Sequence, residues 1–262
     1  MDPVATIRVS VVVATDGHVG KYGGISLAPE ALHSMAEALN SGGIPMTWNH
    51  DPRQPVKAKN VTARVEELES GRLAVVAEFD VEADAWAEIE SHFADAGVPG
   101  GFSFTASTPI SVIGPETADR ITLAAEADHF DEADVVAAAE LLAMETSVHA
   151  QTLFQFSAVQ EVARIIIEMG AGVIVVLGPE IIGAALYDAV KLLLGRKRQP
   201  GRTMVDFRVE EGNGVRRTQA IVVTDDPEVA GTAIRECYRQ ISDLRGIVEY
   251  DPLTGTWVQR DE

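Results

Sequence analysis

Apolar positions along the chain follow two different periods, which predicts a protein of mixed α and β structure. β-Branched or alternating stretches predict strands, over residues 7–14, 44–50, 61–68, 73–79, 121–130, 203–210, 218–223, 247–250 and 256–259. Apolar residues at helical spacing predict helices, over about 29–39, 83–96, 132–144, 157–177, 179–194 and 227–241. This order of elements indicates an α+β fold.

A change in composition at about residues 150–158 predicts a domain boundary. We expect residues 1–150 to form a β-rich domain with two or three helices. Residues 157–198 are expected to form an apolar helical hairpin, and residues 199–262 a small ββαββ module. Because the hairpin is apolar on more than one face, we expect residues 157–198 to join the chain into a homo-oligomer or a larger assembly.

Composition and charge narrow the classes of function. The net charge of -19 argues against a nucleic-acid partner, which would call for a basic face. Cys237 is the one cysteine, so the 262 residues carry no intrachain disulfide and no cysteine-based zinc site. The N-terminus lacks the features of a signal peptide. In the apolar stretch Ile165–Leu194, the longest uncharged piece is Met169–Pro179, well short of the roughly 20 apolar residues that cross a bilayer. We therefore expect a cytoplasmic protein without a membrane partner.

The chemistry of the chain centres on Ser103, which follows the pair Gly100-Gly101 and lies between two phenylalanines. A serine hydroxyl needs a positioned base to act as a nucleophile, and His50 in a predicted strand upstream can provide one. Without a partner, Ser103 is a strand hydroxyl and His50 a loop-edge histidine. A zinc site at His50, Asp51 and His129 is a further possibility, but no pair of histidines has ligand spacing, and we expect neither metal nor cofactor.

Residues 5–140 resemble the prohead proteases of tailed phages, which mature capsids and share their fold with the herpesvirus assemblin proteases. Four segments carry the resemblance, in this order: the loop and helix 24–32, the strand Thr47-Trp48-Asn49-His50-Asp51-Pro52 followed by Pro55-Val56, the hairpin with Glu67, Gly71 and Leu73, and the glycine turn into Gly101-Phe102-Ser103-Phe104. The resemblance implies that residues 1–150 form a mainly antiparallel, barrel-like β domain surrounded by helices. It also implies a serine endopeptidase that cleaves a protein, either a capsid or scaffold component or itself.

The resemblance also implies a third catalytic residue from a strand after the serine. In the viral branch it is a histidine and in the phage branch an acidic residue, so His129 fits the first pattern and Asp128 or Glu126 the second. If residues 121–130 form one strand, the two acidic residues share a face and His129 lies on the other. The sequence separation between Ser103 and His129 is similar to that in the viral branch, and this favours His129 as the third catalytic residue.

Three positions depart from the family pattern and keep two other functions open. The family commonly has glycine where this chain has Lys57, and again soon after the serine, where this chain has Thr105 and Ala106. One alternative is therefore an inactive protein that keeps the protease fold for assembly or interaction. The other is a protease effector of a bacterial conflict system, suggested by a second half that is unusual for phage maturation.

Overall fold

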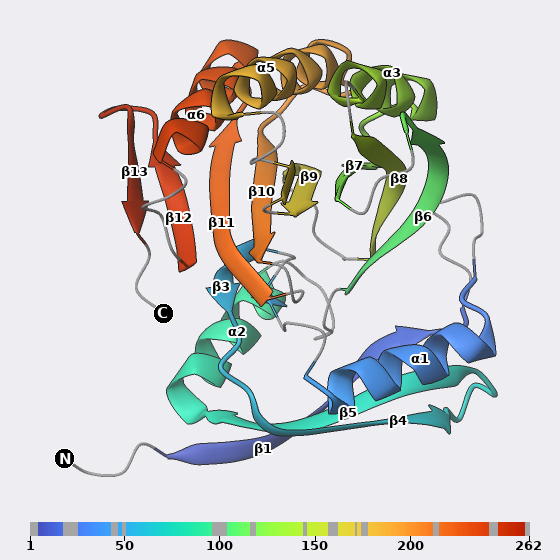
Figure 1. Cartoon of the computed structure of the whole chain (residues 1–262). Helices are drawn as coiled ribbons and strands as arrows, with labels where there is room; N and C mark the ends of the chain where they lie inside the picture. The colour runs from blue at the N-terminus through green and yellow to red at the C-terminus, as the bar shows by residue number, and fades with distance from the viewer. Residues whose placement is uncertain are drawn as a thin grey trace. The chain divides into compact units, whose positions relative to one another are not determined.

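The computed structural model describes twelve stretches of the chain (Figure 1), residues 5–17, 26–42, 47–48, 51–95, 104–115, 119–143, 146–156, 162–170, 172–173, 178–211, 215–240 and 246–259. The chain divides into two compact units. The first spans Met1–Thr105 with Gln155–Gln160, and the second spans Ala106–Phe154 with Glu161–Glu262.

The first unit contains a three-stranded antiparallel sheet with β5 in the middle. Its order is β1 (Thr6–Thr15), β5 (Leu73–Glu82) and β4 (Lys59–Glu67). The predicted hairpin of β4 and β5 is confirmed, and Gly71 supplies the positive φ of 75° that its turn requires. Alternation along β1 and β5 brings Val9, Phe79 and Val81 together in one buried cluster.

Three further elements complete the described part of the first unit. Helix α1 (Pro29–Asn40) buries Leu32, Ala36 and Leu39 and contacts β4 and β5. Helix α2 (Ala83–Asp95) follows β5, and Trp86 on it meets the Phe79 ring edge-on at 6.1 Å. Two short strands, β2 (Thr47–Trp48) and β3 (Asp51–Pro55), pair antiparallel.

The second unit is built on one mixed sheet of eight strands, in the order β13-β12-β11-β10-β9-β7-β8-β6. The strands are β6 (Phe104–Ile113), β7 (Arg120–Glu126), β8 (Ser147–Phe156), β9 (Ala163–Gly170), β10 (Thr203–Glu211), β11 (Val215–Thr224), β12 (Gly246–Asp251) and β13 (Thr256–Gln259). Three pairs are parallel: β7 with β8, β9 with β10, and β11 with β12. A helix connects the members of each pair, as parallel neighbours require.

These crossover helices lie side by side and cover one face of the sheet (Figure 1): α3 (Glu132–Leu142), α5 (Pro179–Gly195) and α6 (Pro227–Gln240). Alternate strand residues such as Leu123, Ile167 and Phe207 point into the apolar core beneath the helices. The intervening residues of the same strands point to the opposite face of the sheet. They include the apolar Met204 and the charged Asp206.

The structure corrects three sequence predictions for residues 145–262. Residues 163–170 form strand β9 instead of the first helix of a hairpin, because the β-branched run Ile165-Ile166-Ile167 pairs on both sides, with β7 and β10. Residues 147–156, which overlap the predicted domain boundary at about 150–158, form strand β8. The ββαββ elements exist as β10-β11-α6-β12-β13, but they continue the same sheet and do not form a separate module.

The broad α+β class holds, whereas the described strands do not form the expected antiparallel barrel. Helix α3 connects β7 to β8, so these two strands run parallel. The sheet they belong to is open, with β13 and β6 at its two ends. Within the described ranges, no helix has both the length and the apolar character needed to cross a membrane.

Candidate functional site

The two residues at the centre of the sequence hypothesis, Ser103 and His50, lie outside the described residues. Their described neighbours can be placed. Strand β6 begins at Phe104, directly after Ser103 in the sequence. On either side of positions 49 and 50, Trp48 of β2 pairs with Asp51 of β3.

The candidates for the third catalytic residue occupy a turn, which corrects the predicted strand 121–130. Strand β7 ends at Glu126, whose carbonyl oxygen accepts hydrogen bonds from the backbone N–H groups of His129 (3.1 Å) and Phe130 (3.0 Å). These bonds turn the chain toward α3, so the alternation of faces that separated Asp128 from His129 does not apply. Glu126 itself is fully buried at the end of β7.

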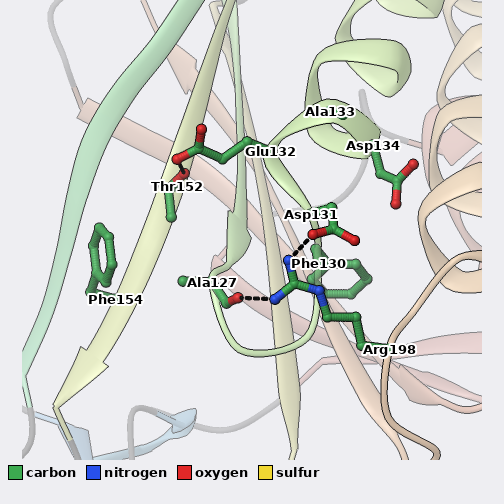
Figure 2. A pocket seen from close by; sticks show the side chains of 9 residues that line it. All are labelled: Ala127, Phe130, Asp131, Glu132, Ala133, Asp134, Thr152, Phe154 and Arg198. Atoms are coloured by element: carbon green, nitrogen blue, oxygen red, sulfur yellow. Dashed lines mark hydrogen bonds and ion pairs between the residues drawn. The ribbon is translucent and has the colours of Figure 1, made fainter. Parts of the chain in front are cut away.

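A pocket of about 540 Å³ lies beside this turn, between the start of α3, strand β8 and the segment after α5 (Figure 2). Its lining consists of Ala127, Phe130, Asp131, Glu132, Ala133, Asp134, Thr152, Phe154 and Arg198. The volume falls within the range of small-molecule sites in proteins.

Arg198 ties the segment after α5 to the turn before α3. Its guanidinium pairs with the carboxylate of Asp131 and donates to the carbonyl oxygen of Ala127 at 3.2 Å, and its backbone N–H donates to that of His129 at 2.9 Å. Figure 2 shows the Arg198 side chain reaching these two groups. Nearby, Arg196 pairs with Asp134 at 2.8 Å. Two of the three carboxylates in the lining therefore have an arginine partner.

The lining of this pocket is mixed in chemistry. It contains carboxylates, one guanidinium, one hydroxyl on Thr152 and two phenylalanines, but no histidine, cysteine or lysine. The Thr152 hydroxyl donates to the Glu132 carboxylate at 3.5 Å. Within the described residues, no three histidine, cysteine or acidic side chains gather closely enough to hold a metal ion.

A buried cluster of charged side chains in the second unit centres on Asp206, in the middle of the sheet. Its carboxylate accepts hydrogen bonds from Arg164 of β9 (2.6 Å), Arg208 of β10 (2.8 Å) and Gln219 of β11 (2.9 Å). Asp206 is fully buried, and the Arg164 and Gln219 side chains are almost fully buried. We call Arg164, Asp206, Arg208 and Gln219 the buried network.

Electrostatics keep Asp206 ionised within this network. Burial disfavours its charged form, but the charges of Arg164 and Arg208 and their hydrogen bonds outweigh that penalty and lower the pKa to about 2. Burial also acts against the charge of Arg208, but Asp206 and, more weakly, Glu168 raise its pKa. With two arginines for one buried aspartate, the network depends on every member being present.

The buried network and the pocket were not predicted from the sequence, because their residues are far apart in the chain and come together only when it folds. A signal existed in part: Met204, Asp206 and Arg208 alternate with Val205, Phe207 and Val209 in a predicted strand. The partner Arg164, however, lay in a segment predicted to be helical.

Comparison with protein-family models, with curated proteins and with solved structures finds no significant match to this chain.

Proposed function

We propose that the chain is a serine endopeptidase of the prohead-protease type, acting on a protein substrate. Ser103 is the nucleophile and His50 the base in this proposal. The observation that carries it is the order of segments along residues 5–140: loop and helix, histidine segment, hairpin, helix, and a glycine turn before the serine. Four described elements match that order in type, namely α1, the β4–β5 hairpin, α2 and β6.

The proposed chemistry proceeds in two halves. The Ser103 oxygen attacks the carbonyl carbon of the scissile peptide bond while the imidazole of His50 accepts the hydroxyl proton. The tetrahedral intermediate then breaks its C–N bond, and the proton passes from His50 to the leaving amine. Water hydrolyses the resulting acyl-enzyme with the same base, which restores the Ser103 hydroxyl.

Labelling by a fluorophosphonate probe tests this proposal without knowledge of the substrate. The probe phosphonylates only a serine that a base has activated, so the parent chain should be labelled on a peptide that contains Ser103. The variants Ser103→Ala and His50→Ala should not be labelled. Ser107→Ala, in an exposed position on β6, is a matched control and should be labelled as strongly as the parent.

A folded parent chain that shows no labelling would contradict the proposal, and so would labelling that survives Ser103→Ala. Circular dichroism spectra that match the parent are needed for each variant, since loss of the fold also abolishes labelling.

The third member of the catalytic group stays a prediction, with His129 and Asp128 as the candidates. Loss of the residue that orients the base lowers the rate of labelling but leaves some reactivity. Loss of the nucleophile removes all labelling. His129→Ala and Asp128→Asn should therefore differ: only the variant that removes the orienting residue should slow labelling by a large factor, about 10²-fold or more.

A second candidate function is an inactive relative that serves in assembly. Lys57, Thr105 and Ala106 favour it, because these side chains stand where the resembling family commonly has glycine. Glycine allows close approach of backbone to a substrate or an oxyanion, and a side chain at such a position obstructs it. Absence of labelling together with a stable oligomer would support this second candidate.

A further inference from the structure

Strand β1 is an edge of the sheet in the first unit, and among the described residues it has a partner strand on one side only. It pairs antiparallel with β5 in a regular register from Thr6 to Val12, and a bulge follows between Val12 and Ala14. An edge strand directs every second backbone N–H and C=O away from its sheet, where another extended strand can pair with them.

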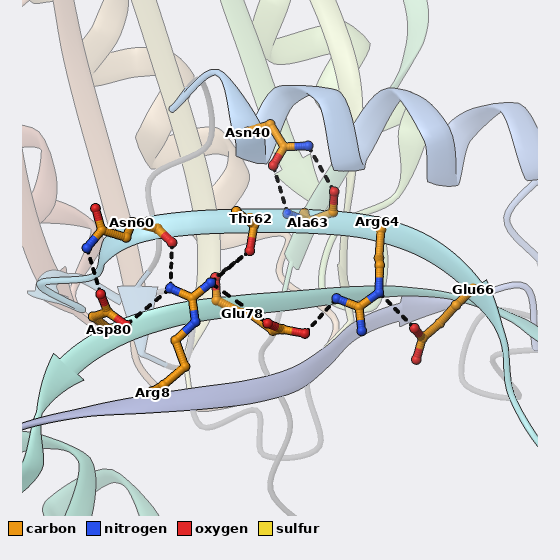
Figure 3. Close-up of polar contacts among 9 residues, drawn as sticks. All are labelled: Arg8, Asn40, Asn60, Thr62, Ala63, Arg64, Glu66, Glu78 and Asp80. Carbon is orange, nitrogen blue, oxygen red and sulfur yellow. Dashed lines mark hydrogen bonds and ion pairs between the residues drawn. The ribbon is translucent and has the colours of Figure 1, made fainter.

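The opposite edge of the same sheet is closed at one point by a side chain. The Asn40 amide donates to the Ala63 carbonyl oxygen (2.9 Å), and its own oxygen accepts the Ala63 N–H (2.7 Å), as Figure 3 shows. One residue at the end of α1 thus imitates the backbone of a neighbouring strand. No such contact is found on β1 among the described residues.

The charge of β1 also favours contact with a second copy. The protein carries 40 acidic residues, yet Thr6–Thr15 contains none and has one arginine, Arg8. Two copies with a net charge of -19 each repel one another over most of their surfaces. The edge of β1 is a place where they can approach with less repulsion.

We propose that β1 pairs with β1 of a second copy, antiparallel and about a two-fold axis, so that two three-stranded sheets become one sheet of six strands. The inference goes beyond the proposed catalytic function and does not depend on it. Such an interface is isologous, because the same strand supplies both halves.

The pattern of faces on β1 selects the register of this pairing. Val9 and Val11 face the buried cluster, while Arg8 and Ser10 lie on the polar face. Residues opposite one another in an antiparallel pair lie on the same face of the sheet. The two-fold axis must therefore pass midway between the two copies of one residue, since an axis between successive residues would pair opposite faces. An axis through Val9 pairs the whole regular stretch, and it puts Ser10 opposite Arg8 and Thr6 opposite Val12 of the second copy.

Sedimentation velocity of the full chain over about 1 to 200 µM should show a monomer that converts to a dimer. The pairing of one strand is small compared with standard interfaces, so we expect a dissociation constant in the micromolar range. Added salt should strengthen the dimer, because it screens the repulsion between two acidic chains. A monomer at every concentration would overturn the proposal.

The variant Ser10→Lys separates the dimer from the stability of the monomer. Within the chain, Ser10 lies opposite Glu78 of β5, so a lysine there gains a favourable neighbour. In the dimer the same lysine faces Arg8 of the second copy and is repelled. We expect dimer affinity to fall about tenfold or more while the melting temperature at low concentration does not fall. Thr108→Lys, an exposed hydroxyl on the edge strand β6, is the control with the same change in charge.

Disulfide cross-linking tests the register itself. The double variant Thr6→Cys/Val12→Cys should form covalent dimers on mild oxidation, because opposite Cα atoms in antiparallel strands lie about 4.5–5.5 Å apart, within disulfide range. Each single variant is a control and should stay monomeric, since its cysteines would be about 20 Å apart. The native Cys237 is buried and does not interfere. A dimer that resists Ser10→Lys and does not cross-link would overturn the proposal, because it would use another surface.

Discussion

Two clusters of arginines and carboxylates, one in each unit, use the same chemistry in opposite surroundings. On the sheet of the first unit, Arg8 contacts Asp80 (3.1 Å) and Arg64 contacts Glu78 (2.6 Å), and both arginines stay substantially exposed (Figure 3). We call Arg8, Arg64, Glu78 and Asp80 the exposed network. In the second unit, Asp206, Arg164 and Gln219 have almost no solvent contact, and the Arg208 side chain is 18% exposed.

The comparison shows that contact distance says little about energetic weight. The Arg164–Asp206 and Arg64–Glu78 contacts are both 2.6 Å long. Water and salt can replace either partner at the exposed pair, so breaking it costs little. At the buried pair nothing replaces a missing partner, and the remaining charges are left without compensation. Stability should therefore respond to the loss of one carboxylate in proportion to its burial.

The largest effect is expected from Asp206→Asn, which changes one carboxylate oxygen to an amide nitrogen and removes the charge. Arg164 and Arg208 then lose the carboxylate that they share, and only Glu168, 3.8 Å from Arg208, remains as a nearby counter-charge. The free energy of unfolding of the second unit should fall by about 3–5 kcal/mol. Chemical denaturation followed by circular dichroism measures it, and hydrogen exchange of the β9 and β10 amides locates it.

Glu78→Gln is the matched control, since it makes the same chemical change in the exposed network. If both variants lost the same stability, burial would not be the deciding factor and the comparison between the networks would fail.

The next effect is expected from Gln219→Met, which keeps the side-chain length but removes a buried donor to Asp206. Hydrogen bonds to charged groups typically contribute about 1.5–3 kcal/mol, and a loss of that size is expected in the same denaturation experiment. The double variant with Asp206→Asn should lose less stability than the sum of the losses in the two single variants, because both changes act on one contact. Strict additivity would mean that the amide and the carboxylate do not interact.

The third effect concerns pH and follows from the lowered pKa of Asp206. A carboxyl whose pKa is about 2 in the folded state, below its ordinary value of 3.8, stabilises the fold above pH 4, and this stabilisation is lost as the pH falls toward 2. The stability difference between the parent chain and Asp206→Asn should therefore narrow by up to about 2 kcal/mol between pH 5 and 2. A difference that stays constant across this range would exclude the proposed electrostatic role of Asp206.

The smallest effect is expected from Glu78→Gln itself. A hydrogen bond from Arg64 lowers the pKa of Glu78, and one from Asn60 lowers the pKa of Asp80, so both groups stabilise the fold above their ordinary pKa and lose that contribution as the pH falls. Contact with solvent makes this contribution small and sensitive to salt, since the Glu78 and Asp80 side chains are both partly exposed. Any shift in melting temperature should disappear at about 1 M salt, where screening acts within about 3 Å. The buried network should show no such sensitivity.

The sequence predicts the first unit well because its signals are local. The alternation from Leu73 to Phe79 and the turn at Gly71 specify a hairpin without reference to the rest of the chain. The helices after Pro29 and from Ala83 follow from apolar spacing in the same way. These elements fall within a few residues of their predicted bounds.

The second unit was harder to predict because its central strands are buried on both faces. The run Ile165-Ile166-Ile167 has no alternation, and periodicity cannot tell such a strand from a buried helix. The buried network depends on that strand, since it brings Arg164 beside Asp206. The turn at Asp128 and His129 was read as strand because its backbone hydrogen bonds to Glu126 leave no mark on the hydrophobic pattern.

The hydrogen bonds between Asn40 and Ala63 have a consequence for how far sheets of this protein can grow. A fibre needs two open edges on every subunit, one for each neighbour. A sheet with one edge occupied by its own asparagine can join a single neighbour through the other, and the assembly is then complete. Replacing Asn40 with alanine would open the second edge, and a finite pair would acquire the means to polymerise.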